Sequence, residues 1–98
     1  MTTATLISTR DFCTWHRVEY TFISSLREAG LVETTIIEQA EYIPETQLQR
    51  LEKMVRMHHD LDINIAGIEA ITHLLDRLEA IQDEIRELKN KLNRYEGD

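Results

Sequence analysis

Apolar residues recur at alternating spacings of three and four along the last third of the chain. The positions, which we call the seam, are Ile71, Leu74, Leu78, Ile81, Ile85, Leu88, Leu92 and Tyr95. This is the a/d pattern of heptads, in which one stripe of a helix packs against a second helix. No Pro or Gly interrupts the segment between Ile68 and Tyr95, so the pattern predicts one continuous helix.

The seam is long for so small a chain. At about 1.5 Å per residue it extends for about 37 Å, more than the ~30 Å diameter of a small domain. At its beginning Ile68 and Leu75 widen the apolar face, as in an amphipathic helix that lies on its own domain. Beyond Ile81 the flanking residues are charged or amide (Gln82, Glu84, Lys89, Lys91). We therefore expect residues 65–98 to form a helix through which two copies of the chain associate.

The first thirty residues predict two short helices separated by a tight turn. Ser8 or Thr9 can cap the first helix, which carries Phe12, Cys13 and Trp15. The second is expected from about Glu19 to Ala29, with one apolar face (Phe22, Ile23, Leu26, Ala29) and Gly30 as its left-handed cap. This order is typical of a helix-turn-helix unit.

β-branched residues predict a small hairpin after this unit. Residues 34–37 are Thr-Thr-Ile-Ile, and residues 38–43 can return alongside them as a wing. Pro44 fits the start of a third helix, where its missing N–H group costs nothing. Asp62-Ile63-Asn64 ends that helix, and Asn64 can cap the long one. The expected fold is mainly α, with a winged helix-turn-helix part at 1–64 and the dimerisation helix at 65–98, together one structural domain.

The charge balance disfavours nucleic acid as a partner. Eleven basic and eighteen acidic side chains among 98 residues give a net charge of −7. Nucleic-acid affinity comes largely from Lys and Arg that displace counterions. A protein partner with a basic surface therefore fits better.

Other function classes also lack support in the sequence. The single cysteine, Cys13, cannot form an intrachain disulfide, and residues 1–8 lack the basic and apolar regions of a signal peptide. No apolar run approaches the ~18 residues of a membrane helix. We expect a cytoplasmic protein without membrane contact.

The pair His58-His59 invites a metal interpretation, which helix geometry disfavours. Adjacent helical residues point about 100° apart and chelate poorly together. We expect one of the two imidazoles to be packed and the other solvated. The chain also lacks a Gly-rich phosphate loop and a nucleophile with a partnered base, so we expect neither enzymatic activity nor a cofactor.

The order helix, helix, wing, helix, long helix resembles the MerR family of winged helix-turn-helix proteins over nearly the whole chain. A more specific resemblance lies in residues 55–68 (VRMHHDLDINIAGI), together with Asp11-Phe12-Cys13 and residues 74–78 (LLDRL). These segments resemble the CbpM-type chaperone modulators. Asp62 stands where MerR-like chains often have Gly, and His16-Arg17 replaces the usual Thr-Gly of the first turn. Arg17 is therefore expected either to adopt a left-handed conformation or to belong to a different turn.

The resemblance implies a homodimer that binds the J-domain of a DnaJ-like co-chaperone of the CbpA type and inhibits it. Because such a J-domain is typically basic along one helix, acidic side chains are the candidate partner-binding residues. They are Asp60 and Asp62 at the helix junction, with Glu33, Glu38 and Glu41 on the wing.

The alternative function is that of a MerR-like DNA-binding transcription regulator. It would use Arg10, Arg17 and Arg27 for phosphate contacts, although Ser24-Ser25 replaces the Arg-Tyr pair expected on the second helix. The orientation of the paired helices also stays open. The resemblance favours antiparallel helices, whereas Glu84 and Lys89 at g and e positions would attract in a parallel pair.

Overall fold

The computed structural model describes residues 5–96. Residues 1–4, which belong to the segment predicted to lack a signal peptide, lie outside this range. So do residues 97 and 98, the last two of the predicted dimerisation helix. The chain divides into two compact units, the first ending at Ile68 and the second beginning at Glu69.

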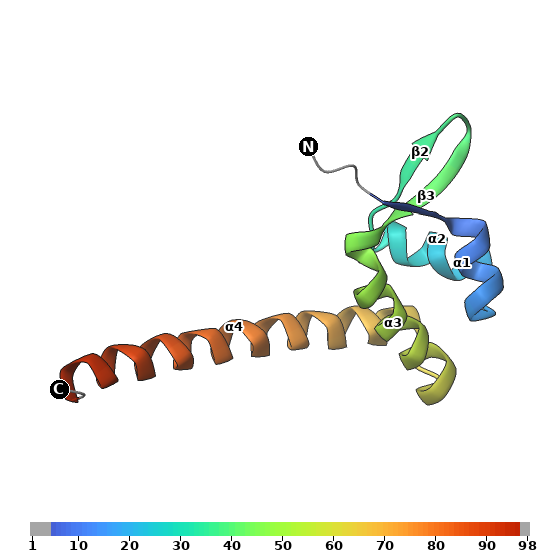
Figure 1. Cartoon of the computed structure of the whole chain (residues 1–98). Coiled ribbons are helices and arrows are strands. Elements are labelled where there is room, and N and C mark those ends of the chain that lie inside the picture. Colours follow the sequence, from blue (N-terminus) through green and yellow to red (C-terminus); the bar gives the residue numbers. More distant parts are fainter. Residues whose placement is uncertain (1–4, 97–98) are drawn as a thin grey trace. The chain divides into compact units, whose positions relative to one another are not determined.

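The predicted fold class is confirmed, because helices predominate and are joined by one small sheet (Figure 1). In chain order the elements are β1 (Leu6–Ser8), α1 (Thr9–His16), α2 (Tyr20–Glu28), β2 (Thr35–Ile37), β3 (Ala40–Pro44), the 3-10 helix η1 (Glu45–Gln47), α3 (Leu48–Leu61) and α4 (Ile65–Glu96). Within residues 5–96, no helix is both long and apolar enough to cross a lipid bilayer.

Arg17, in the turn between α1 and α2, adopts the left-handed conformation, which was one of the two alternatives expected for it. Ser8 caps α1 by accepting a hydrogen bond from the backbone N–H of Asp11. Arg17 then has φ 55° and ψ 46°. This backbone conformation is disfavoured for any residue that has a Cβ atom, which explains why glycine is common at such a position.

Helix α2 ends as predicted at a glycine. Gly30 has φ 75°, and its N–H donates to the carbonyl of Arg27 at 3.0 Å. The N–H of Leu31 donates to the carbonyl of Leu26 at 2.9 Å. This pair of bonds is a Schellman motif, which satisfies carbonyls that the helix end leaves open.

The sheet corrects two predictions. Its strand order is β1-β3-β2, and β1 was not predicted, since three residues are too short to show a periodicity. Pro44 does not start a helix: it ends β3 opposite Leu6, with an extended ψ of 141°, and η1 precedes α3. Pairing with β1 keeps Pro44 extended, and a proline is tolerated at a strand end because it only lacks a donor.

The predicted wing is the hairpin of β2 and β3, with Thr35 opposite Tyr42 and Ile37 opposite Ala40. Its two-residue turn consists of Glu38 and Gln39, whose φ angles are 50° and 69°. Two positive φ angles are typical of a type I′ turn, which usually contains Asn or Gly. The tight turn therefore forms without its usual residues.

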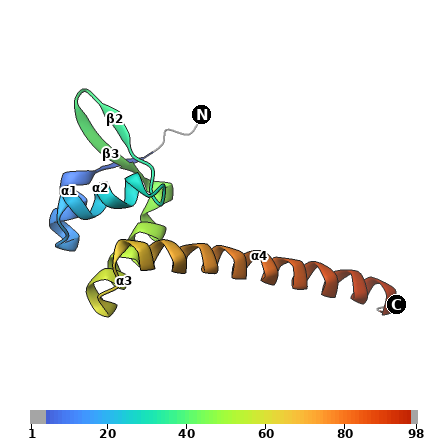
Figure 2. The same ribbon diagram turned by 180° about the vertical axis from the view of Figure 1, so that it is seen from behind.

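The core of the first unit is assembled from α1, α2, β3, α3 and the first turn of α4. Its fully buried side chains include Phe12, Ile23, Leu26, Ile43, Leu51, Met54 and Ile68. Figures 1 and 2 show that, within this unit, the tip of the wing and the C-terminal end of α3 lie at opposite ends.

The connection from α3 to α4 is as predicted at Asn64. Asp62 follows α3 in a left-handed conformation, with φ 54° and ψ 38°. The side-chain oxygen of Asn64 then accepts a hydrogen bond from the N–H of Gly67 at 2.8 Å. A Cβ on Gly67 would lie 2.6 Å from a methyl group of Ile63, so only glycine fits there without a shift.

Candidate functional site

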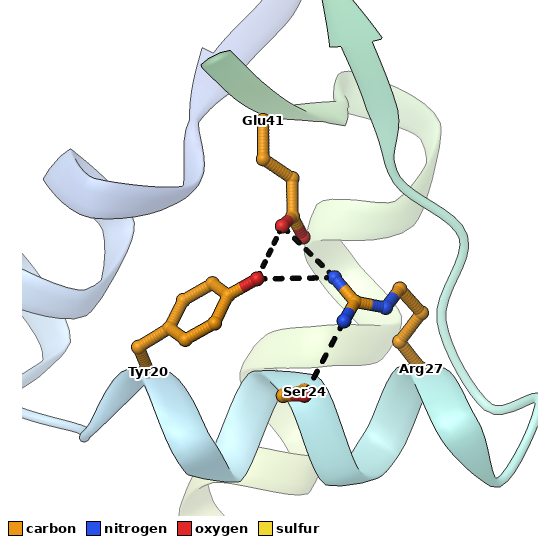
Figure 3. Close-up of polar contacts among 4 residues, drawn as sticks. All are labelled: Tyr20, Ser24, Arg27 and Glu41. Carbon is orange, nitrogen blue, oxygen red and sulfur yellow. Dashed lines mark hydrogen bonds and ion pairs between the residues drawn. The ribbon is translucent and has the colours of Figure 1, made fainter. Parts of the chain in front are cut away.

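A polar network joins the second helix of the helix-turn-helix unit to the wing (Figure 3). Glu41 of β3 reaches between Tyr20 and Arg27, which lie two turns apart on α2. Its Oε1 accepts hydrogen bonds from the Tyr20 hydroxyl and from Nη1 of Arg27, the latter at 2.9 Å. Nη2 of Arg27 also donates to the Ser24 hydroxyl at 3.3 Å.

The network keeps both of its charged groups ionised. Burial opposes ionisation of Glu41, but hydrogen bonds from Tyr20 and Arg27 outweigh it and lower the pKa of the carboxyl below its usual range. Hydrogen bonds with Tyr20 and Glu41 raise the pKa of Arg27. Sequence reasoning placed Glu41 among the partner-binding candidates, whereas the structure places its carboxylate in this internal contact.

The helix-turn-helix unit of α1 and α2 has few free cations for contacts with a DNA backbone. Arg27 was one of three candidate phosphate contacts, and its guanidinium is paired with Glu41. Arg10 and Arg17 are exposed. The Ser24 hydroxyl accepts from Arg27, and Ser25 is half-buried. The α2 face therefore offers little positive charge to a phosphate backbone.

Much of the segment 55–68 has a structural role. Val55 and Ile68 belong to the core, Asn64 caps α4, and Gly67 permits the close approach to Ile63. The ring of His58 stacks on Phe22 with centroids 4.5 Å apart. Folding alone accounts for these residue types.

Five other residues of that segment are exposed toward the C-terminal end of α3. We call Arg56, His59, Asp60, Leu61 and Asp62 the junction surface, all five of which are exposed. Leu61, which sequence reasoning did not single out, is 68% exposed between the two carboxylates.

Helix electrostatics do not explain why acidic residues occupy this position. The C-terminus of a helix carries a partial negative charge, so acidic side chains there are unfavourable for the helix itself. Asp60 and Asp62 add to the negative potential of the α3 end. The junction surface thus combines one apolar side chain with two carboxylates, beside the guanidinium of Arg56 and the imidazole of His59.

The remaining acidic candidates lie elsewhere. Glu33 and Glu38 are exposed at either end of β2, on the wing. Glu38 lies in the turn at the wing tip, which is at the opposite end of the first unit from the end of α3 (Figures 1 and 2), whereas the N–H of Glu33 donates to the side-chain oxygen of Gln47 in η1. The structure does not bring all five into one cluster.

The histidine pair is arranged as predicted, with His58 stacked on Phe22 and His59 exposed. Over residues 5–96, no three side chains of His, Cys, Asp or Glu converge to hold a metal ion. Burial, and secondarily the charge of Glu41, raises the pKa of the Cys13 thiol, which favours its protonated form.

The seam lies along α4 and is largely exposed. Ile71 is half-buried, and the other seven members are between 41% and 88% exposed. Contiguous apolar side chains at this exposure are typical of a surface that packs against another molecule.

One comparison with known proteins gave a match. The family model described as MerR HTH family regulatory protein matches residues 7–90. Neither the comparison with curated proteins nor the comparison with solved structures gave a significant match.

Proposed function

Because the chain belongs to the MerR family of helix-turn-helix regulatory proteins, we propose that it regulates by binding a protein and not by reading DNA. The proposed partner is the J-domain of a DnaJ-like co-chaperone, whose activity the bound chain inhibits. The chain acts in the cytoplasm, without catalysing a reaction, as a homodimer paired through the seam.

The observation that carries this proposal is the junction surface. It lies within the segment that resembles CbpM-type chaperone modulators, and packing in the core does not explain its exposed side chains. Asp60 and Asp62 flank the exposed Leu61. An apolar side chain surrounded by charge is a common composition of a protein-binding patch.

The junction surface would contribute to binding through charge complementarity with the partner. A helix of the partner that carries Lys and Arg would meet the two carboxylates and the negative end of α3. Such complementarity chiefly raises the association rate and the specificity, and salt weakens it. Burial of Leu61 would then slow dissociation.

The second candidate function is a DNA-binding transcription regulator. Family membership favours it, and Arg10 and Arg17 are exposed cations on the helix-turn-helix unit. The pairing of Arg27 with Glu41 and the net charge of −7 weigh against it. A salt-titrated mobility shift distinguishes the two: tight binding to one sequence at physiological ionic strength would favour the regulator.

The direct test is a calorimetric titration of the chain against the J-domain from the same organism. We expect binding of the wild-type chain. In the variant Asp60→Lys with Asp62→Asn, we expect slower association and a flatter salt dependence. Asn is chosen at position 62 because it tolerates the left-handed conformation.

The matched control is Glu79→Lys with Glu87→Gln, which changes the net charge by the same amount on exposed positions of α4. It should bind as the wild type does. No detectable binding of the wild-type chain at tens of micromolar would overturn the modulator proposal. Equal loss in both variants would mean that net charge, and not the junction surface, attracts the partner.

A further inference from the structure

Strand β2 lies at an edge of the small sheet. The strand order β1-β3-β2 gives it a neighbouring strand on one side only, within residues 5–96. The hairpin that it forms with β3 projects beyond α1 and α2 in both views (Figures 1 and 2). All three residues of β2 are exposed, so the first unit leaves this strand uncovered.

The hairpin register turns the backbone of Ile36 toward the free edge. In an antiparallel ladder the residues of a central strand bond alternately to one neighbour and to the other. The N–H of Glu45 donates to the carbonyl of Thr5, on the β1 side, at 2.9 Å. Two steps of two back along the chain give the same orientation to Glu41, which therefore makes no ladder bonds to its β2 partner, Ile36. The N–H and C=O of Ile36 point away from β3, where a further strand would bond them.

Two apolar side chains lie on this strand. Ile36 is 71% exposed and Ile37 is 44% exposed. Because successive residues of a strand point to opposite faces, the two side chains lie on different faces of the wing. A further strand along the edge would cover part of both. Exposed strand edges of this kind are sites where extended peptides add to a sheet.

The charge of the wing determines which kind of strand fits there. Residues 33–45 contain four glutamates, at positions 33, 38, 41 and 45, and neither lysine nor arginine. The carboxylate of Glu41 is paired with Arg27, whereas Glu33 and Glu38 are exposed on either side of β2. Opposite charges on neighbouring strands attract and like charges repel. A strand that carries Lys or Arg on both sides of an apolar stretch therefore fits best.

A second copy of β2 fits the same edge poorly. Antiparallel pairing about Ile36 would bring Glu33 of each copy close to Glu38 of the other, and parallel pairing in register would place identical glutamates side by side. Four carboxylates would then lie along one short contact, where the wing offers no lysine or arginine to balance them. A DNA backbone would meet the same repulsion.

From these observations we infer that the free edge of β2 binds an extended, basic segment of another protein by β-strand addition. The segment bonds to the backbone of Ile36 and covers the side chains of Ile36 and Ile37. Its flanking Lys or Arg residues lie near Glu33 and Glu38. The inference goes beyond the proposed function and does not rest on it, because the edge is separate from the junction surface.

A labelled synthetic peptide tests the inference. The probe is Ser-Lys-Val-Thr-Val-Lys-Ser with a fluorescent N-terminus, and its anisotropy is measured during titration with the full chain. We expect saturable binding that weakens with added salt. One control peptide has Glu in place of both Lys residues, and another is N-methylated at its three central residues, which removes the backbone donors. We expect each control to bind roughly tenfold more weakly or less still.

Two variants of the chain locate the site. Ile36→Pro removes the outward N–H and leaves the ladder to β3 intact, since proline is tolerated on an edge strand. We expect it to weaken peptide binding roughly tenfold or more. Glu33→Gln with Glu38→Gln should weaken binding roughly three- to tenfold and flatten its salt dependence. Circular dichroism during thermal unfolding checks that both variants fold.

The matched control is Glu79→Gln with Glu87→Gln, which changes the net charge equally on exposed positions of α4 and should bind the peptide as the wild type does. Equal loss in the wing and α4 variants would overturn the inference, because net charge alone would then attract the peptide. So would wild-type affinity in Ile36→Pro, or no saturable binding of the wild-type chain at up to about 1 mM.

The other possible occupants give different outcomes. Displacement of the peptide by duplex DNA at physiological salt would assign the edge to nucleic acid and overturn the inference. In the variant Ile85→Asp with Leu88→Asp, self-association that Ile36→Pro abolishes would assign it to a second copy. J-domain binding is measured separately, so its failure would overturn the proposed function and leave this inference standing.

Discussion

The double substitution Ile85→Asp and Leu88→Asp should convert the proposed dimer into a monomer. The two residues are adjacent a and d positions near the middle of the seam, and they are 49% and 64% exposed in the single chain. In a paired helix both would be covered. The substitution removes the apolar side chains and places carboxylates in the contact.

The expected effect can be worked out from these exposures. Full burial of an Ile or Leu side chain contributes about 1.5–3 kcal/mol, so covering the exposed half contributes roughly 1 kcal/mol. Four such side chains in a dimer give about 4 kcal/mol. This corresponds to about a thousandfold in the dissociation constant, and burial of unpaired carboxylates increases it further.

Light scattering coupled to size exclusion, with sedimentation over a range of concentrations, measures the change. Asn90→Asp with Asn93→Asp adds the same charge at the f and b positions of α4 and should remain dimeric. Circular dichroism confirms that the variants keep the first unit folded. If the Ile85→Asp and Leu88→Asp variant still forms a dimer as stable as the wild type, the seam is not the interface.

Two further predictions concern the helix-turn-helix unit. In urea denaturation at equal protein concentration, the Arg17→Gly variant should be more stable than Arg17→Ala by about 0.5–1 kcal/mol. Glycine avoids the left-handed penalty of roughly 1–2 kcal/mol, but part of this gain is lost because glycine is more flexible in the unfolded chain. Equal midpoints would mean that the turn is not left-handed. Because the folded pKa of Glu41 is lowered, its contribution to stability is present above its ordinary pKa and is lost as the pH falls through the folded value. Glu41→Gln should therefore lose less stability than the wild type between about pH 5 and 3 in urea titrations, and identical pH profiles would contradict an ionised pair with Arg27.

Features that depend on neighbouring residues could be read from the sequence. The α-helices, the Gly30 and Asn64 caps and the seam follow from hydrophobic spacing and capping chemistry, which act within a few residues. The wing was predicted from its β-branched residues. Its turn, with Glu38 and Gln39 at positive φ, lacked the usual residue signal and was specified by the strands that it connects.

Features that depend on distant contacts required the tertiary structure. Strand β1 exists because Leu6–Ser8 pairs with β3 more than thirty residues later, and the same pairing keeps Pro44 out of the helix. Sequence reasoning listed Glu41 with the exposed acids, because only the fold brings it between Tyr20 and Arg27. Likewise, segment 55–68 carried the resemblance as a whole. Only the tertiary structure shows that His58 packs against Phe22 and that Val55 and Ile68 lie in the core, whereas Asp60, Leu61 and Asp62 face solvent.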